Sequence, residues 1–488
     1  MTGEADQIGA VVVTPPVAVS VPIAVDLDET LISTDSLLES LFVLAKRKPL
    51  ELLRLPAWLA QGRARFKHLL AEAAMPDVHT LPYDREFVAW LRTEKQNGRS
   101  LILVTGADAA LANNVAAELG LFDRVIASDG TTNLSGDGKR QRLVAEFGEK
   151  GFDYAGHGRC DRPIWRAARK SILVRPSPGL LKTEVKLSDV DRIFDDSPPS
   201  LDIYLHAIRV HHWTKNALVF VPTIAAQQLY SIASLAHGCL TFLAFSLAAS
   251  CIYLLNDLTD LPDDRLHPQK SQRMLASGQL SAVRAVALIP ALLLAALALG
   301  LIQSWSLLAI LGLYWGLMTL YCLKLRAIAV VDALAVAFGY SLRVTGGAVA
   351  VGVPLSIWLV MFCILFFFSL TLLKRYAELI TMHSLMGAAG QARAYLVQDR
   401  HRIALFGCAS GYVALLVFGF YIVDLNDERY SRLALLWIIW ALLLYWVTYL
   451  WLMAGRKKII GDPVAFALRD RVTRIVGLLA LVTVLVVG

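Results

Sequence analysis

The sequence has few charged residues and no paired cysteines. Only 18% of its 488 residues are Asp, Glu, Lys or Arg, against about 25% in soluble domains. Its 56% hydrophobic content and mean hydropathy of +0.54 exclude a disordered chain and a single soluble domain. The six cysteines form no CxxC pair and no Cys/His ligand spacing, so neither a disulfide framework nor a zinc site is expected.

The shortage of charge is confined to one part of the chain. Residues 1–200 hold 25 Lys+Arg and 27 Asp+Glu, whereas residues 201–488 hold 22 Lys+Arg and 13 Asp+Glu. The first part is nearly neutral, and the second is basic and very apolar. We therefore expect a soluble N-terminal part joined to a part embedded in membrane lipid, with no nucleic-acid partner.

Apolar stretches of about 20 residues, the length that crosses a bilayer, begin near residue 215. The nine predicted spans are 216–234, 237–255, 283–300, 303–321, 328–350, 354–373, 404–423, 433–453 and 472–488. The loops after the second, fourth, sixth and eighth spans are rich in Lys and Arg. The positive-inside rule therefore predicts that these loops and the N-terminal part are cytoplasmic and that the C-terminus is outside. The predicted location is a bacterial-type inner (plasma) membrane.

Acidic residues of the membrane part gather directly after the second span, in the sequence NDLTDLPDD. Asn256, Asp260 and Asp264 are spaced i, i+4 and i+8, so they share one face if the helix of that span continues. Mg²⁺ is usually held by one or two carboxylates together with substrate phosphates. This spacing, near Lys270 and Arg273, predicts a clamp for Mg²⁺ and a diphosphate; a solvated acidic loop is the alternative.

The pattern N-D-x-x-D-x-x-x-D resembles the first aspartate motif of the UbiA prenyltransferase superfamily. Further segments are similar to its decaprenyl-phosphate phosphoribosyltransferase branch: AIRVHHWTKNALVF (207–220), HPQKSQRMLASGQLS (267–281), YCLKLRAIAVVDALAVAFGYSLRVTGGAV (321–349) and KRYAEL (374–379). The resemblance implies an all-α nine-span bundle. It also implies Mg²⁺-dependent transfer of phosphoribose from phosphoribosyl diphosphate to a polyprenyl phosphate, with release of diphosphate.

One departure from the wider superfamily favours this branch. Where aromatic prenyltransferases carry a second Asp-rich motif, this chain has Lys374 and Arg375, which suit phosphates that bind without a metal. The resemblance and the spacing together assign Asn256, Asp260 and Asp264 to catalysis and the metal. The predicted substrate-binding residues are Asp257, Lys215, Asn216, Lys270, Arg273, Lys324, Arg343, Lys374 and Arg375.

Simpler roles stay open for four of these cations. Lys324 is also placed to extend its ammonium toward the membrane surface. A charge such as Arg343 inside an apolar span is costly and usually functional, but an ion pair with Asp332 is the structural alternative. Lys374 and Arg375 also fit the role of positive-inside anchors.

The soluble part opens with VPIAVDLDET (21–30), an apolar strand that ends in D-x-D-x-T and resembles motif one of the haloacid dehalogenase (HAD) superfamily. The resemblance implies Asp26 as the nucleophile and Asp28 as the general acid/base. It implies Thr105 and Lys139 as phosphate-binding residues, and Asp26, Asp28 and Asp161 as Mg²⁺ ligands. The motif-four pattern G-D-x-x-x-D reads GHGRCD, so His157 stands where an aspartate would bind the metal, which puts phosphatase activity in question.

The predicted organisation has four parts: an N-terminal extension (1–20), an α/β HAD-like (Rossmannoid) domain (21–175) with a small helical cap (36–80), a linker (176–206) and the membrane domain (207–488). The HAD-like domain is expected to remove the 5-phosphate of the lipid-linked product, or else to serve as a scaffold. An aromatic prenyltransferase using a prenyl diphosphate, and a transporter with a regulatory soluble domain, are the alternative functions. The sequence is compatible with a homo-oligomer.

Overall fold

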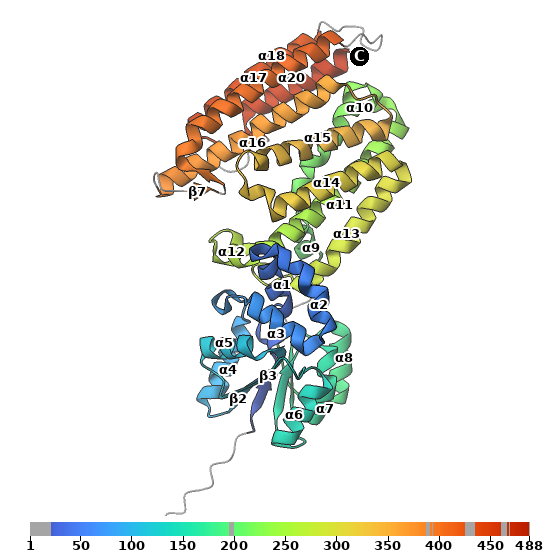
Figure 1. The fold of residues 1–488 in the computed structure, drawn as a ribbon. Coiled ribbons are helices and arrows are strands. Elements are labelled where there is room, and N and C mark those ends of the chain that lie inside the picture. Colours follow the sequence, from blue (N-terminus) through green and yellow to red (C-terminus); the bar gives the residue numbers. More distant parts are fainter. Residues whose placement is uncertain are drawn as a thin grey trace, which may run out of the picture. The chain divides into compact units, whose positions relative to one another are not determined.

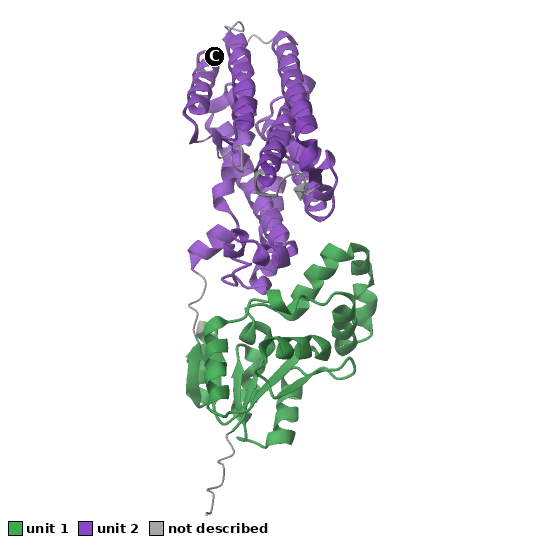
Figure 2. Cartoon of the chain, turned by 90° about the vertical axis from the view of Figure 1, so that its left-hand side faces the viewer, with its two compact units in different colours: residues 1–198 green, residues 199–488 purple. Residues whose placement is uncertain are grey.

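A computed structural model of the chain describes residues 21–194, 200–386, 391–392, 394–424, 435–459, 466–467 and 469–487. The chain divides into two compact units, residues 1–198 and 199–488 (Figure 2). The division falls where the charge composition of the sequence changes.

Unit 1 contains a six-stranded parallel sheet with helices packed against it (Figure 1). Its strands are β1 (Ile23–Val25), β2 (Leu101–Asp108), β3 (Arg124–Ser128), β4 (Asp153–Gly156), β5 (Ser171–Val174) and β6 (Val190–Phe194), in the order β3-β2-β1-β4-β5-β6. The helices are α4 (Arg85–Gln96), α5 (Ala109–Leu119), α6 (Asp137–Phe147), α7 (Arg162–Ala167) and α8 (Pro178–Leu187). The predicted α/β class is confirmed. The strand order reverses between β1 and β4, and such a reversal leaves a crevice at the carboxyl ends of the strands.

Three helices between β1 and α4 form the predicted cap: α1 (Ser36–Arg47), α2 (Leu55–Ala60) and α3 (Arg63–Ala73), with a 3₁₀ segment at Pro49–Arg54. The Asp35 side chain caps α1 by accepting a hydrogen bond from the backbone N–H of Leu38. Val43, Leu44 and Leu70 are buried in a small hydrophobic core that belongs to the cap itself.

The predicted linker, 176–206, is wrong over most of its length. Residues 178–187 form α8, and β6 pairs in parallel with β5, with Val174 opposite Phe194. The Phe194 ring contacts the rings of Phe87 and Trp90 at centroid distances of 5.1 and 5.4 Å. This buried contact outweighs a polar, Pro-rich composition that otherwise indicates a loop. The connection between the units is therefore the short stretch between Phe194 and α9 (Leu201–Ala207).

Unit 2 is a bundle of long helices. Among the residues that the structure describes, seven helices are long and apolar enough to cross a membrane: α11 (Ile232–Thr259), α13 (Ala282–Gln303), α14 (Trp305–Leu323), α15 (Val331–Val351), α16 (Ile357–Met386), α17 (Arg400–Asp424) and α18 (Leu436–Gly455). An eighth long helix, α20 (Arg471–Val487), has 17 residues and covers the ninth predicted span. The helical class is confirmed, and the seven helices cover seven of the nine predicted spans.

The first predicted span, 216–234, is not one helix. The chain runs through a 3₁₀ segment at Val210–Phe220, the short helix α10 (Val221–Ala225) and a 3₁₀ turn at Gln228–Tyr230 before α11 begins. Pro222 occupies the first turn of α10, and Gln227 has a positive φ of 59°. Both features interrupt a regular helix.

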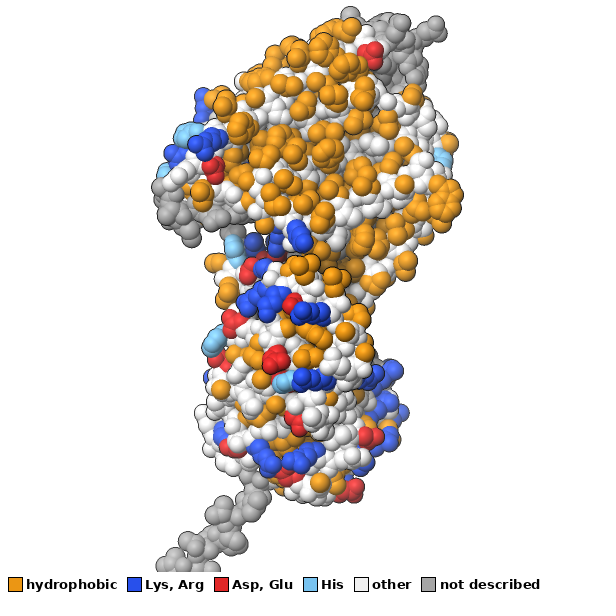
Figure 3. Space-filling model, in the orientation of Figure 1, with side chains coloured by type: hydrophobic (Ala, Val, Ile, Leu, Met, Phe, Trp, Pro, Cys, Tyr) orange, Lys and Arg blue, Asp and Glu red, His pale blue; other side chains and the backbone are white. Residues whose placement is uncertain are grey.

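The outer face of unit 2 is apolar. In Figure 3 hydrophobic side chains cover most of the visible surface of this unit. Leu294, Leu313 and Phe406 are 68%, 60% and 54% exposed, far more than such side chains are in a soluble core. A surface of this kind is stable against lipid tails, so unit 2 is an integral membrane bundle.

Candidate functional site

The aspartate motif lies where α11 ends. The helix stops at Thr259, and Asp260 has φ −95° and ψ 2°, before the chain turns into α12 (Leu261–Leu266). The regular helix therefore breaks at Asp260, although backbone hydrogen bonds of the i, i+4 kind still join Asp260 N–H to Asn256 O and Asp264 N–H to Asp260 O. Asn256 and Asp260 contact one arginine and Asp264 contacts another.

Arg326, in the turn between α14 and α15, forms the first of these contacts. Its Nη1 and Nη2 atoms lie 2.6 and 2.5 Å from the two carboxylate oxygens of Asp260, and Nη1 lies 3.3 Å from Asn256 Oδ1. This is a bidentate, charge-assisted pair. The sequence interpretation chose Lys324 in the same turn, but Lys324 is exposed.

The other two motif carboxylates share Arg273. Its Nη1 donates to Asp264 and lies 3.2 Å from Asp257 Oδ1. Arg209, which precedes the first 3₁₀ segment, contacts Asp257 through Nη2 at 2.6 and 2.8 Å. These contacts form two sets, Asp260 with Arg326, and Asp257 and Asp264 with Arg209 and Arg273. We call the two sets together the acid–arginine cluster. Its members are Asp257, Asp260, Asp264, Arg209, Arg273 and Arg326.

The donor chemistry of this cluster fits Mg²⁺. Its ligand atoms are carboxylate and amide oxygens, which a hard cation prefers. Among the described residues Asp264 Oδ1 is buried and accepts no hydrogen bond, and Lys270 Nζ lies 3.7 Å from it. A metal ion would satisfy this orphaned oxygen and release the arginines for phosphate groups.

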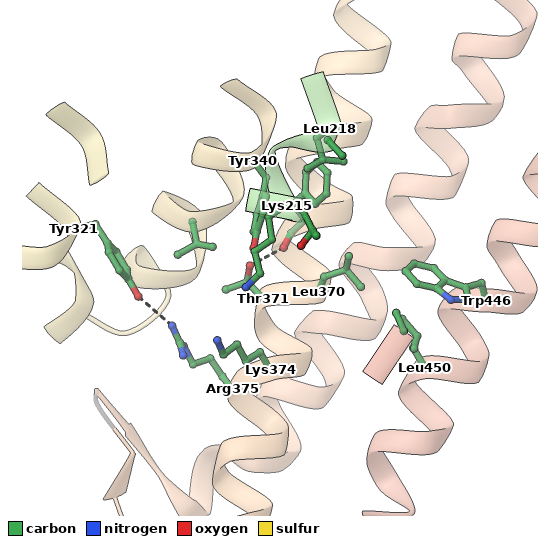
Figure 4. Close-up of a pocket in the computed structure, with 15 residues that line it drawn as sticks. Lys215, Leu218, Tyr321, Tyr340, Leu370, Thr371, Lys374, Arg375, Trp446 and Leu450 are labelled. Carbon is green, nitrogen blue, oxygen red and sulfur yellow. Dashed lines mark hydrogen bonds between the residues drawn. The ribbon is translucent and has the colours of Figure 1, made fainter. Parts of the chain in front are cut away.

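A second feature of unit 2 is a cavity of about 420 Å³ lined by Lys215, Lys374 and Arg375 (Figure 4). The described lining includes these three cations, Tyr321 and Tyr340, and no acidic side chain. We call this cavity the cationic pocket.

An apolar cavity of about 310 Å³ lies beside the cationic pocket. Leu218 and Phe367 line both cavities. The remaining lining of the apolar cavity is predominantly aliphatic and aromatic, including Phe362 and Phe366. The two cavities together match an amphipathic molecule with an anionic end and a long apolar part.

Arg375 is held firmly at the edge of the cationic pocket. Its Nε lies 2.7 Å from Asp332 Oδ2, and its Nη1 lies 2.9 Å from Glu378 Oε2. Its Nη2 also donates to the Tyr321 hydroxyl at 3.3 Å, the contact drawn in Figure 4. Arg375 therefore brings the Asp332 and Glu378 carboxylates to the edge of this pocket.

Arg343 and Asn216 are placed differently from the prediction. Arg343 does not pair with Asp332; its Nε donates to Asn216 Oδ1 at 2.6 Å and its Nη2 to the Tyr314 hydroxyl at 2.8 Å. Its guanidinium also lies 5.2 Å from the centre of the Tyr340 ring. Asn216 is 1% exposed. Both side chains are therefore committed to partners inside the bundle.

In unit 1, the residues of the predicted phosphatase site gather at the crevice between β1 and β4. Asp26 directly follows β1, and its Oδ1 accepts from Lys139 Nζ at 2.6 Å and from the backbone N–H of Leu27 at 2.8 Å. Burial raises the pKa of Asp26 to about 6, although Lys139 acts in the opposite direction. Burial disfavours the charged Lys139 ammonium, but the neighbouring carboxylates of Asp26 and Asp161 raise its pKa.

His157 and Asp161, after β4, complete the crevice. Ligand atoms of Asp26, His157 and Asp161 all lie within 4.8 Å of one another, the one such group in the described part of the chain. The Asp161 carboxylate already accepts from the Tyr154 hydroxyl and from two backbone N–H groups. His157 Nε2 lies 3.1 Å from Glu29 Oε2. Burial lowers the pKa of His157, but this contact and Asp161 outweigh it and raise the pKa.

These donors do not fit a Mg²⁺ site, because an imidazole replaces an oxygen ligand and Mg²⁺ demands oxygen. A set of two carboxylates and one imidazole suits transition ions better. Asp28 lies outside this group and accepts from the backbone N–H of Ser36 at the start of α1. Thr105 is fully buried in β2, where its hydroxyl accepts from the Ala107 N–H.

Two segments supply residues to both features of unit 2. Residues 209–218 contribute Arg209 to the acid–arginine cluster and Lys215 to the cationic pocket, and residues 321–326 contribute Tyr321 and Arg326. Arg209 and Arg326 were missed as site residues. Their signal in the sequence was their presence within the two segments that carry the family resemblance.

Comparison with known proteins agrees with this division of the chain. Residues 217–459 match the UbiA prenyltransferase family, and residues 23–156 match the haloacid dehalogenase-like hydrolases. The solved structure of a UbiA homologue from Archaeoglobus fulgidus bound to GPP and Mg²⁺ covers 58% of this chain and 99% of its own, with a TM-score of 0.47 and 17% identity.

Two relatives in sequence differ in how much of the chain they cover. The protein y4nM of Sinorhizobium fredii is 31% identical over 468 residues, 94% of this chain and 89% of its own. The decaprenyl-phosphate phosphoribosyltransferase of Corynebacterium glutamicum is 30% identical over 220 residues, 44% of this chain and 66% of its own. Residues 217–459 therefore belong to the UbiA prenyltransferase family, and a haloacid dehalogenase-like domain, residues 23–156, precedes them.

Proposed function

We propose that this protein transfers a 5-phosphoribosyl group from phosphoribosyl diphosphate to a polyprenyl phosphate of the decaprenyl type and releases diphosphate. The observation that carries the proposal is the separation of an acid–arginine cluster from a cationic pocket whose described lining has no acid. A donor bearing a diphosphate suits the first, and a lipid monophosphate suits the second. The partial similarity to a decaprenyl-phosphate phosphoribosyltransferase supports the same assignment.

The donor occupies the acid–arginine cluster in this scheme. Mg²⁺, when bound there, would neutralise charge on the departing diphosphate. Asn256, Asp260 and Asp264 would hold this ion through their side-chain oxygen atoms. Arg326 and Arg273, released from these carboxylates, donate to diphosphate oxygens, for which the planar guanidinium is well suited.

The acceptor occupies the cationic pocket and the apolar cavity beside it. Lys215 and Lys374 hold the lipid phosphate, and the side chains around Leu218 and Phe367 enclose the start of the polyprenyl chain. The bond between C1 of ribose and the diphosphate oxygen breaks as a phosphate oxygen of the lipid bonds to C1. The protein's contribution is to orient two anions that otherwise repel each other.

The HAD-like domain is proposed to remove the 5-phosphate from the lipid-linked product. The carboxylate of Asp26 attacks phosphorus as the bond to the ribose oxygen breaks, Lys139 offsets the negative charge of the carboxylate and the phosphate, and Asp28 delivers a proton to the leaving oxygen. Water then attacks the aspartyl phosphate and gives its proton back to Asp28, which releases phosphate and restores Asp26. We further propose that both sites face the cytoplasm. Residues of the acid–arginine cluster lie in or beside the Lys- and Arg-rich loops, and the positive-inside rule predicts that these loops and the N-terminal part are cytoplasmic.

The test uses the purified full chain with Mg²⁺, ribose-labelled phosphoribosyl diphosphate and a polyprenyl phosphate, and identifies lipid products by mass spectrometry. A lipid-linked phosphoribose supports transfer. Both steps are supported if the unmodified protein makes a lipid-linked ribose and the Asp26→Asn variant makes a lipid-linked phosphoribose. Asp260→Asn should abolish transfer, whereas Asp26→Asn should not change it. If no lipid product forms but a prenyl diphosphate is consumed with an aromatic acceptor, the proposal is wrong and the chain is an aromatic prenyltransferase.

A further inference from the structure

One surface of unit 1 combines exposed leucines with a concentration of positive charge. It is formed by residues 46–65, which comprise the end of α1, the 3₁₀ segment, α2 and the start of α3 (Figure 1). We call this surface the cap tip. It lies outside the crevice described above, and none of its residues has a role in the proposed reactions.

The helical segments of the cap tip have two apolar faces. A soluble cap needs only the one that packs against its own core. Leu52, Leu55 and Trp58, spaced by three residues, pack against the core of the cap. On the other side Leu50 and Leu53 are 74% and 80% exposed.

Leu59, on α2, extends this outer face and is 55% exposed. Three leucines in ten residues are thus exposed to solvent on one small helical element. Exposed apolar groups at this density mark an interaction surface.

Basic side chains surround these leucines. Residues 46–65 hold six Lys and Arg and one acid, Glu51, whereas the other residues of 1–200 hold 19 Lys and Arg and 26 Asp and Glu. The six are all exposed: Lys46, Arg47, Lys48, Arg54, Arg63 and Arg65. The positive charge of an otherwise acidic domain is therefore concentrated where the leucines are exposed.

The covalent connection keeps this domain close to a bilayer. Unit 1 ends in β6 at Phe194 and the bundle begins with α9 at Leu201. The chain between these residues spans at most about 25 Å when fully extended. An anionic bilayer surface is therefore always within reach of the domain, and its charge is complementary to that of the cap tip.

We propose that the cap tip docks on the anionic surface of the membrane, with Leu50, Leu53 and Leu59 entering the headgroup region and the surrounding Lys and Arg contacting lipid phosphates. Interfacial helices combine apolar and basic side chains in this way. The proposal is independent of the transfer reaction, because it concerns only how the soluble domain meets lipid.

Hydrogen–deuterium exchange of the full chain in lipid nanodiscs tests the proposal. Backbone amides of residues 46–65 should exchange at least about tenfold more slowly in nanodiscs with 30% phosphatidylglycerol than in pure phosphatidylcholine. Added salt should reduce this difference, because it screens the attraction between the basic side chains and the lipid. This comparison needs no variant, so it does not depend on a mutant that folds.

Variants then identify the side chains responsible. The triple change Leu50→Ser, Leu53→Ser and Leu59→Ser should remove the lipid-dependent protection. A matched control is Val185→Ser with Leu187→Ser on α8, outside the cap tip, where two apolar side chains are 54% and 55% exposed; it should leave the protection intact.

Two results would overturn the proposal. Equal exchange in anionic nanodiscs, neutral nanodiscs and detergent would show that lipid does not cover the cap tip. Protection that ignores lipid charge but rises with protein concentration would assign the surface to a second copy of the chain.

Discussion

Replacement of Arg326 by methionine is the most informative single change in the membrane bundle. Arg326 makes a bidentate pair with Asp260 at 2.6 and 2.5 Å, and its side chain is 25% exposed. If this guanidinium passes to the diphosphate when the donor binds, Arg326→Met removes a charge-assisted hydrogen bond worth about 1.5–3 kcal/mol. The expected result is a loss of about 10- to 150-fold in kcat/KM for phosphoribosyl diphosphate.

The assay measures initial rates of lipid-linked product at fixed polyprenyl phosphate, with phosphoribosyl diphosphate and Mg²⁺ varied independently. Arg326→Lys keeps the charge but loses the bidentate geometry, so its loss should be smaller. Arg284→Met is the matched control, since Arg284 is exposed on α13, and its rate should equal that of the unmodified protein. An unchanged kcat/KM, or a lower requirement for Mg²⁺ with no loss of donor affinity, would refute the reasoning. It would show that Arg326 merely competes with the metal for Asp260.

Asp332→Asn should destabilise the bundle by about 1.5–3 kcal/mol, because it removes one of the two carboxylates that contact the buried Arg375 guanidinium and leaves Glu378 as the other; the Asp332 and Arg375 side chains are at most 3% exposed. Thermal unfolding in detergent measures this, and an unchanged midpoint would contradict it. His157→Asp should complete an oxygen-only donor set in unit 1 and strengthen Mg²⁺ binding at least about tenfold. Calorimetric titration of the full chain, with Asp260→Asn present to remove the other site, would contradict this if the affinity did not change. Gly347→Ala should sharply reduce the yield of folded protein, since the added Cβ would lie 2.0 Å from the Val219 carbonyl oxygen. Fluorescence-detected size-exclusion chromatography provides the measurement, and a normal monodisperse peak would show that the backbone yields at this contact.

Local patterns predicted the residues of the crevice in unit 1 because its geometry follows from strand topology. Asp26 ends one apolar run and His157 follows another. Once both runs become neighbouring parallel strands, β1 and β4, their carboxyl ends meet at one edge of the sheet. Lys139 could be placed only through its family resemblance, because its 2.6 Å contact with Asp26 joins residues 113 apart.

Partner choice in the bundle could not be predicted in the same way. The spacing of Asp257, Asp260 and Asp264 located the acids, but their arginine partners come from segments on either side of the motif and up to 66 residues away. The same difficulty led the sequence interpretation to consider an Asp332–Arg343 pair, although Asp332 binds Arg375 from the next helix. Hydropathy patterns specify which segments are buried, and they do not specify which charges meet inside.

The buried position of Arg343 has a consequence for how the protein enters the membrane. Arg343 lies near the middle of α15, the least hydropathic of the seven candidate spans at 1.4. An arginine at the centre of a helix opposes insertion by the translocon by about 2.5–3.5 kcal/mol. Its partners, Asn216 and Tyr314, lie earlier in the chain and are synthesised first. We therefore expect α15 to leave the translocon as part of a group with α14 and the segment around Asn216, so that membrane integration and tertiary packing occur together.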